Sequence, residues 1–89
     1  MYEITISPRI KKEIDKLPLK DFKRVDTAIW DLRENPRPQG VKKLKGTVHR
    51  IRVGDWRVIY AVFDKDKRVI IGKVERRSED TYDKVEGLF

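Results

Sequence analysis

The stretch HRIRVGDWRVIY, residues 49–60, decides the fold because it contains two short strands and the turn between them. Apolar and charged residues alternate before Gly54–Asp55, and an apolar run interrupted by Arg57 follows it. A Gly-containing pair between two strand-like runs is typical of a two-residue hairpin turn. This turn pairs Arg52 with Arg57, and Arg50 then projects from the same face. Like charges directly opposite each other destabilise a sheet, so we expect these arginines to serve a ligand rather than the scaffold.

The other face of this hairpin is apolar and indicates where the rest of the core packs. Its side chains are Ile51, Val53, Trp56, Val58, Tyr60 and Val62. Trp56 and Tyr60 are therefore interpreted as core residues, and so is Trp30 on a predicted helix. His49 shares this apolar face and not that of Arg50, which favours a structural or rim role over a catalytic one.

The chain continues through a second turn into a third strand. We expect strands at residues 47–53, 56–63 and 68–76, with the second turn at 64–67. If Phe63 faces Arg68, uniform pairing puts Arg57 opposite Val74. Arg76 then joins the other three arginines on the uncovered face of the sheet. The same register places two charged residues on the helix side, Lys73 and Glu75, and a bulge would change it.

Residues before the hairpin predict one strand and two helices. Residues 2–6 alternate between apolar and polar, as a half-buried strand does. Ser7–Pro8 is a helix start, and Pro18 ends that helix. Asp21 is expected to cap a second helix, which Asn35–Pro36 stops. The two helices together form a hairpin over residues 8–34 with one apolar side.

The predicted architecture is a single α+β domain over residues 1–89. It comprises an N-terminal strand, a helical hairpin and a three-stranded antiparallel meander, which make a four-stranded sheet with both helices on one face. Residues 35–46, NPRPQGVKKLKG, are expected to be a basic loop because they contain two prolines and two glycines. The tail RRSEDTYDKVEGLF, residues 76–89, is expected to contain a short C-terminal helix capped by Ser78 or to be irregular.

Composition restricts the kind of partner and site. The net charge is +7, and charged residues make up 42% of the chain against 38% hydrophobic residues. A basic field of this size attracts nucleic acid or acidic proteins. There is no cysteine and one histidine, so we expect no disulfide, metal site or cofactor. No apolar run is long enough to span a membrane and no secretory leader is visible, so a cytoplasmic location is expected.

The pattern LKG…HRIRVGDWRVIY…ERRSEDTY resembles the RelE toxins of bacterial and archaeal toxin–antitoxin pairs, within the wider RelE/ParE superfamily. The resemblance spans nearly the whole chain, and its most specific part is Leu44–Gly46 followed by the basic hairpin. It implies an mRNA interferase, an endoribonuclease that enters the ribosomal A site and cuts the messenger RNA there. It also implies a cognate acidic antitoxin as a protein partner.

The resemblance implies a catalytic set of five residues: Arg50, Arg52, Arg57, Arg76 and Tyr82. Family members often carry Lys at the first two positions, so the arginines here are a departure that removes a neutral amine as a general base. Arg77 replaces Arg76 if a bulge shifts the register, and it is otherwise an RNA contact. Lys42, Lys43 and Lys45 are candidate contacts to ribosomal RNA, against the simpler interpretation of a solvated loop.

The expected chemistry is metal-independent attack of the RNA 2′-hydroxyl on the adjacent phosphorus. Arginines suit stabilisation of the charge that develops on the phosphate, but none of them is a base. Three roles remain open: Tyr82 as a base with a depressed pKa, positioning of the RNA by the ribosome, and stacking of a base on Tyr82. Two rival functions are a ParE-like gyrase inhibitor and a non-catalytic protein that binds RNA or an antitoxin through its basic face.

Overall fold

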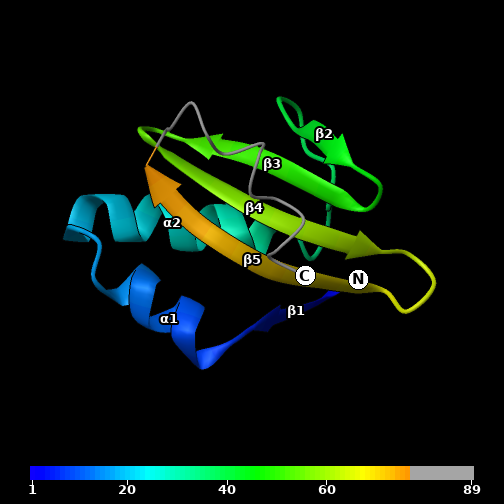
Figure 1. Cartoon of the computed structure of the whole chain (residues 1–89), viewed down its shortest axis with the longest axis horizontal. Helices are drawn as coiled ribbons and strands as arrows, with labels where there is room; N and C mark the ends of the chain where they lie inside the picture. The colour runs from blue at the N-terminus through cyan, green and yellow to red at the C-terminus, as the bar shows by residue number, and fades with distance from the viewer. Residues whose placement is uncertain (77–89) are drawn as a thin grey trace.

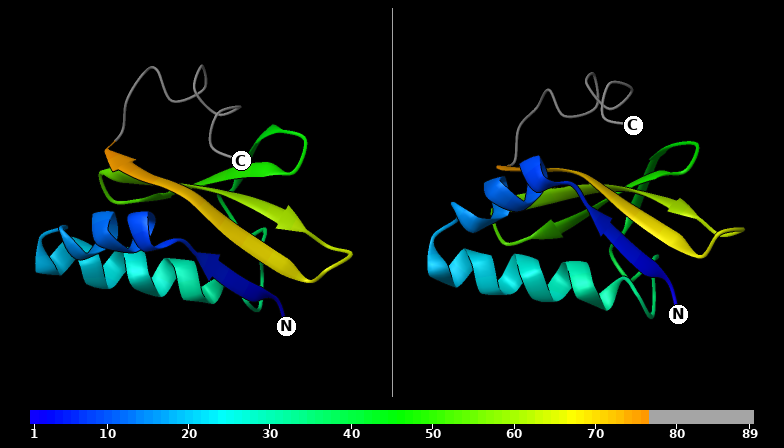
Figure 2. Two further views of the ribbon diagram at one scale, coloured as in Figure 1. Left: turned by 60° about the horizontal axis from the view of Figure 1, so that its bottom comes forward. Right: turned by 90° about the horizontal axis from the view of Figure 1, so that it is seen from below.

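The computed structural model describes residues 1–76 of the 89-residue chain as an α+β fold, in agreement with the predicted class. Its elements are β1 (Glu3–Ile6), α1 (Pro8–Asp15), α2 (Leu19–Asp31), β2 (Lys42–Lys45), β3 (Val48–Val53), β4 (Trp56–Phe63) and β5 (Arg68–Arg76). The five strands form one sheet in the order β1-β5-β4-β3-β2 (Figure 1). β1 runs parallel to β5, and the other neighbours are antiparallel. Figure 2 shows both helices on the same side of the sheet.

The fifth strand, β2, corrects the prediction of a four-stranded sheet with a basic loop over residues 35–46. Lys42 pairs with Arg50 and Lys43 with His49, so the lysine run adds an edge strand to β3. Lysines and nearby Pro and Gly residues argue against a strand by propensity. On an edge, however, exposed lysines are a favourable feature because they discourage pairing with another chain.

The helices begin where the sequence indicates, although their caps differ. Ser7 caps α1 and accepts a hydrogen bond of 3.3 Å from the Ile10 backbone N–H. For α2 the cap position is occupied by Pro18, and Asp21 lies in the first turn instead of capping it. An acidic side chain there still interacts favourably with the positive end of the helix dipole.

The core lies between the helices and one face of the sheet. The helices contribute Ile10, Ile14, Val25, Ile29 and, just beyond α2, Leu32; the sheet contributes Ile51, Val58, Tyr60, Val62, Val69, Ile71 and Val74. Tyr60 is fully buried, as predicted, and its hydroxyl donates a 2.7 Å hydrogen bond to the Pro36 carbonyl oxygen. Trp30 is not a core residue: it is 38% exposed, and its indole N–H donates to Asp26 on the surface of α2.

The β3–β4 hairpin has the predicted two-residue turn. Val53 pairs with Trp56, and Gly54 adopts a φ of +62°. A positive φ at the first central position but not at Asp55 is the pattern of a type II′ turn, which matches the twist of the flanking strands. The Arg24 guanidinium of α2 lies 3.0 Å from the position that a Cβ at residue 54 would occupy. Glycine at position 54 therefore allows both the positive φ of the turn and the close approach of Arg24.

The β4–β5 pairing contains a bulge that changes which side chains share a face. Phe63 faces Arg68 as predicted, but the register moves from Tyr60–Ile71 to Ile59–Lys73, which leaves Gly72 unpaired. Beyond that glycine every side chain of β5 points to the opposite face from the one that uniform pairing gives. The bulge turns Val74 into the core and takes two charged residues out of it, Lys73 and Glu75.

Candidate functional site

Three arginines share the face of the sheet opposite the helices, as the sequence predicts. Arg52 on β3 is paired directly with Arg57 on β4, and Arg50 is paired with Ile59 in the next row of the same face. Neighbouring strands lie about 4.8 Å apart, so the three positive charges occupy a small area. We call this surface the arginine face.

The three arginines differ in exposure. Arg52 is exposed, whereas Arg50 and Arg57 are 5% and 7% exposed. The helices leave this face uncovered, as predicted, but the two arginines nearer the middle of the sheet are shielded from water. A guanidinium that is shielded from water interacts more strongly with a phosphate than one in bulk solvent. The arrangement thus combines an accessible arginine with two that act at lower local dielectric constant.

The bulge at Gly72 adds two charged residues to the arginine face that sequence reasoning assigned to the helix side. Glu75 is paired with Arg57, and Lys73 is paired with Ile59. Arg52, Arg57 and Glu75 therefore form one row across β3, β4 and β5. A glycine within a strand is a recognised indicator of a bulge, and it was the one feature of the sequence that pointed to this arrangement.

Arg76 does not join the arginine face, which corrects the predicted convergence of four arginines. It is paired with Trp56, and its guanidinium carbon lies 5.2 Å from the centre of the Trp56 ring, a cation–π contact on the helix side. The reason is again the bulge, which reverses the facing of the last four residues of β5. Arg77 and Tyr82 lie outside the described residues, so their assignment to the site stays a prediction.

The three predicted RNA-contacting lysines lie on β2 and are exposed. Lys42 is paired with Arg50 and so extends the arginine face toward the sheet edge. Lys43 is paired with His49 and projects from the other face. An irregularity follows Lys43, after which Lys45 pairs with Val48. The lysines thus project from both faces of the edge strand and do not form one flat patch. Their role as RNA contacts stays a prediction.

His49 is buried in a structural position, as expected. Its Nδ1 lies 2.7 Å from the Thr47 carbonyl oxygen, so this nitrogen carries the proton and donates it. The ring stacks on Tyr60 with centres 5.8 Å apart. Burial lowers the pKa of His49, with a further contribution from the positive charge of Arg37. A neutral histidine packed on the helix side of β3 cannot serve chemistry on the arginine face.

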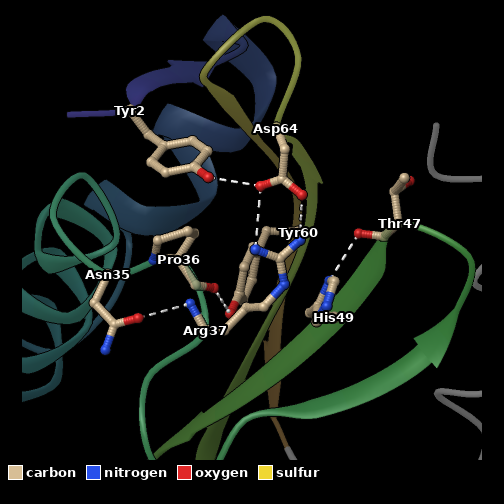
Figure 3. Close-up of polar contacts among 8 residues, drawn as sticks. All are labelled: Tyr2, Asn35, Pro36, Arg37, Thr47, His49, Tyr60 and Asp64. Carbon is tan, nitrogen blue, oxygen red and sulfur yellow. Dashed lines mark hydrogen bonds and ion pairs between the residues drawn. The ribbon is translucent and has the colours of Figure 1, made fainter.

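A polar cluster that sequence reasoning missed joins three distant segments (Figure 3). Arg37 donates two hydrogen bonds to the Asp64 carboxylate, of 2.8 and 3.1 Å, and the Tyr2 hydroxyl donates a third of 2.6 Å. These bonds hold the pKa of Asp64 down to about 2. The cluster fastens the N-terminus and the loop after α2 to the β4–β5 turn. Contacts between residues so far apart in the chain leave no local pattern in the sequence.

A cavity of about 640 Å³ lies next to this cluster, at the end of the sheet away from the Gly54 turn. His49, Thr47 and Val62 contribute to its walls. It is separate from the row formed by Arg52, Arg57 and Glu75, which lies close to that turn. Within residues 1–76, no group of three or more acidic, His or Cys side chains is arranged to hold a metal ion, and no helix is long and apolar enough to cross a membrane.

The sequence of the chain matches those of proteins described as toxins. A family model described as the ParE toxin of the type II toxin–antitoxin system parDE matches residues 4–81. A candidate toxin of Methanocaldococcus jannaschii, RelE1, is 36% identical over 81 residues, which cover 85% of this chain and 90% of that protein.

Solved structures of RelE proteins have a similar fold. RelE in the RelE–RelB complex of Pyrococcus horikoshii superimposes with a TM-score of 0.80 at 34% identity, over 88% of this chain and 97% of that one. The isolated RelE toxin of Escherichia coli, at 22% identity, shares the fold with a TM-score of 0.74 over the full length of both chains.

A five-stranded α+β domain with a basic sheet face, related in sequence to RelE and ParE proteins, defines a class of small toxins. The chain belongs to the RelE/ParE family of toxins from type II toxin–antitoxin systems.

Proposed function

We propose that this protein is a ribosome-dependent endoribonuclease that cuts messenger RNA in the A site and so inhibits translation in the cytoplasm. The observation that carries the proposal is the placement of Arg50, Arg52 and Arg57 on one face of the sheet. Family membership and the similarity to RelE proteins support the same activity.

The arginine face suits a phosphate whose negative charge increases during the reaction. Attack of the 2′-hydroxyl on phosphorus produces a pentacoordinate transition state with additional charge on the non-bridging oxygens. Guanidiniums stay protonated at any working pH and offer a planar set of donors to such oxygens. Removal of one preorganised donor of this kind typically slows a reaction by about 100-fold to 1,000-fold. Arg57 occupies the middle strand of the site, so we propose that it makes the principal contact with the phosphate.

We further propose that an acidic antitoxin neutralises the protein. The relative from Pyrococcus horikoshii was crystallised with RelB, and the net charge of +7 gives this chain a strong attraction for an acidic partner. Exposed sheet edges and an apolar helix surface are common docking sites for segments that fold on binding. Co-expression with the gene adjacent to its own, followed by co-purification at moderate salt, tests this partnership.

The cleavage proposal is tested by primer extension on messenger RNA bound to programmed 70S ribosomes. We expect a cut within the A-site codon, reduced by about 100-fold to 1,000-fold in Arg57→Ala. Arg9→Ala on α1 is the matched control, because Arg9 is an exposed arginine on the helix side of the molecule and is expected to cut normally.

Two other results of this experiment would contradict part of the proposal. Absence of a cut with the folded wild-type protein would refute the nuclease proposal. The ParE description of the matching family makes gyrase the second candidate target, and a gyrase cleavage-complex assay would then test it. A cut that survives Arg57→Ala would keep the function but remove Arg57 from the site.

A further inference from the structure

We propose that Glu75 is the proton acceptor for the 2′-hydroxyl in the RNA cleavage described above. This inference rests on the proposed nuclease function and names a residue that the arginines require. Arginine cannot accept a proton, so a site built from guanidiniums alone lacks a base. Glu75 is the one carboxylate on strands β2 to β5, all of which lie within the described residues.

The position of Glu75 follows from the strand register. It is paired with Arg57 on β4, and Arg57 is paired with Arg52 on β3. Side chains paired across neighbouring strands have Cβ atoms about 5 Å apart on the same face. A phosphate that binds Arg57 therefore has a carboxylate on one side and a second guanidinium on the other. The 2′-hydroxyl is only a few bonds from the phosphorus that it attacks, which brings it within reach of the Glu75 side chain.

The bulge at Gly72 is the feature that makes this possible. With uniform pairing, Glu75 would point toward the helices and Val74 toward the arginine face. The single unpaired glycine reverses both, and Val74 becomes part of the core. Bulges are over-represented next to active sites, where they redirect side chains. Glu75 is half-buried, so it is accessible to RNA and partly shielded from water.

Each proton transferred in the cleavage reaction has a donor and an acceptor. The 2′-oxygen forms a bond to phosphorus as its proton passes to the Glu75 carboxylate, and the bond from phosphorus to the 5′-oxygen breaks. The leaving 5′-oxygen takes a proton from water, and the hydroxide so formed removes the proton from Glu75. The products are a 2′,3′-cyclic phosphate and a free 5′-hydroxyl, with no oxidant, reductant or metal ion. Arg52 and Arg57 stabilise the charge on the phosphate throughout.

The alternative is a structural role, in which the negative charge of Glu75 only orients the Arg57 side chain. The two roles differ in their dependence on pH. If Glu75 removes the proton, a variant without the carboxylate depends on hydroxide, and its cleavage rate rises about tenfold for each pH unit. If Glu75 only orients Arg57, its removal weakens RNA binding and leaves the shape of the pH–rate profile unchanged. The charged groups that share the arginine face with Glu75 are Lys42, Lys73 and the three arginines.

The test is single-turnover cleavage on programmed ribosomes between pH 6.5 and 8.5, with Glu75→Gln, Glu75→Asp and Glu3→Gln. Glu3 is an exposed glutamate on β1 and controls for the loss of one negative charge. For Glu75→Gln we expect a rate about 100-fold to 10,000-fold lower at pH 7, the usual range for loss of a general base, with ribosome affinity unchanged within twofold and a rate that rises with pH. Glu75→Asp should retain part of the activity and the wild-type profile, and Glu3→Gln should match the wild type.

The results can refute the role of Glu75 without refuting the nuclease function. If the wild type cuts and Glu75→Gln cuts equally fast, or is slower with a profile parallel to that of the wild type, Glu75 is not the base and the nuclease proposal stands. If the wild type itself does not cut, both fail. Thermal unfolding of each variant checks that the fold is retained, and Glu75→Asp supplies the second measurement if Glu75→Gln does not fold.

Discussion

The Tyr60 hydroxyl on β4 donates a 2.7 Å hydrogen bond to the Pro36 carbonyl oxygen, which links the centre of the sheet to the loop that follows α2. Both residues are buried, so the carbonyl has little access to water as an alternative partner. Burial also raises the pKa of Tyr60 well above its ordinary value, which keeps the hydroxyl protonated as a donor across the working range of pH.

We therefore expect Tyr60→Phe to lower the free energy of unfolding by about 1 to 3 kcal/mol, because it leaves a buried acceptor unsatisfied. Urea denaturation measures this change. Tyr2→Phe is the matched control, since the Tyr2 hydroxyl is bonded in an exposed position and its loss should have a smaller effect. Equal losses for both variants would contradict the importance assigned to the Pro36 bond.

The Asp64 carboxylate predicts a loss of stability in acid. Its pKa is lowered from the ordinary 3.8 to about 2, first by hydrogen bonds from Arg37 and then by the bond from Tyr2. A carboxylate with a depressed pKa in the folded state contributes stability that is fully present above about pH 4 and is lost as the pH falls toward 2. Wild type and Asp64→Asn should therefore differ in stability near neutral pH and converge as the pH falls to about 2. A difference that persists at pH 2 would exclude this carboxylate as the cause.

Substitution of Gly54 should destabilise the hairpin that positions Arg52 and Arg57. An L-residue at a φ of +62° is strained by about 1 to 2 kcal/mol, and a Cβ there also approaches the Arg24 guanidinium to 3.0 Å. Gly46→Ala separates the two effects, because its φ is +55° and its Cβ would meet nothing within 4 Å. We expect Gly54→Ala to lower the melting temperature more than Gly46→Ala, and Arg24→Ala to remove the excess. An equal loss at both glycines would mean that the Arg24 contact is irrelevant.

The lysines of β2 predict a salt-dependent contribution to ribosome binding. If Lys42, Lys43 and Lys45 contact phosphates, replacing all three by Gln should weaken binding at low salt and reduce the slope of log affinity against log salt by about 2 to 3. The charge-matched control replaces Lys11, Lys12 and Lys16, which belong to α1 and its C-terminal end. Filter binding to 70S ribosomes between 50 and 300 mM KCl gives both slopes. Identical slopes for the two triple variants would assign the effect to net charge alone.

The sequence predicted those parts of the fold that local patterns control. The Gly54–Asp55 turn, the pairing of Arg52 with Arg57, and the helix start at Ser7 all depend on residues within a few positions of one another. The burial of Tyr60 followed from the same alternation, which also placed His49 on the apolar face in a structural or rim position.

The parts that were not predicted depend on distant contacts or on one residue. β2 is a strand because β3 provides an edge for it, against the propensity of its lysines. A single unpaired glycine, Gly72, decided which face received Glu75 and Arg76. Trp30 lies at the margin of its helix stripe, where periodicity does not decide between core and surface.

The parallel pairing of β1 with β5 has a consequence for the order of folding. Glu3 pairs with Arg68, so most of the chain lies between the first strand and its partner. Contacts at such sequence separation form late, because the loop between them must be closed first. During synthesis the helical hairpin and the β3–β4 hairpin can form as they emerge, but β1 has no partner until β5 has left the exit tunnel. The row of Arg52, Arg57 and Glu75 also requires β5. A nascent chain therefore lacks both the complete sheet and the complete site until β5 has emerged from the ribosome.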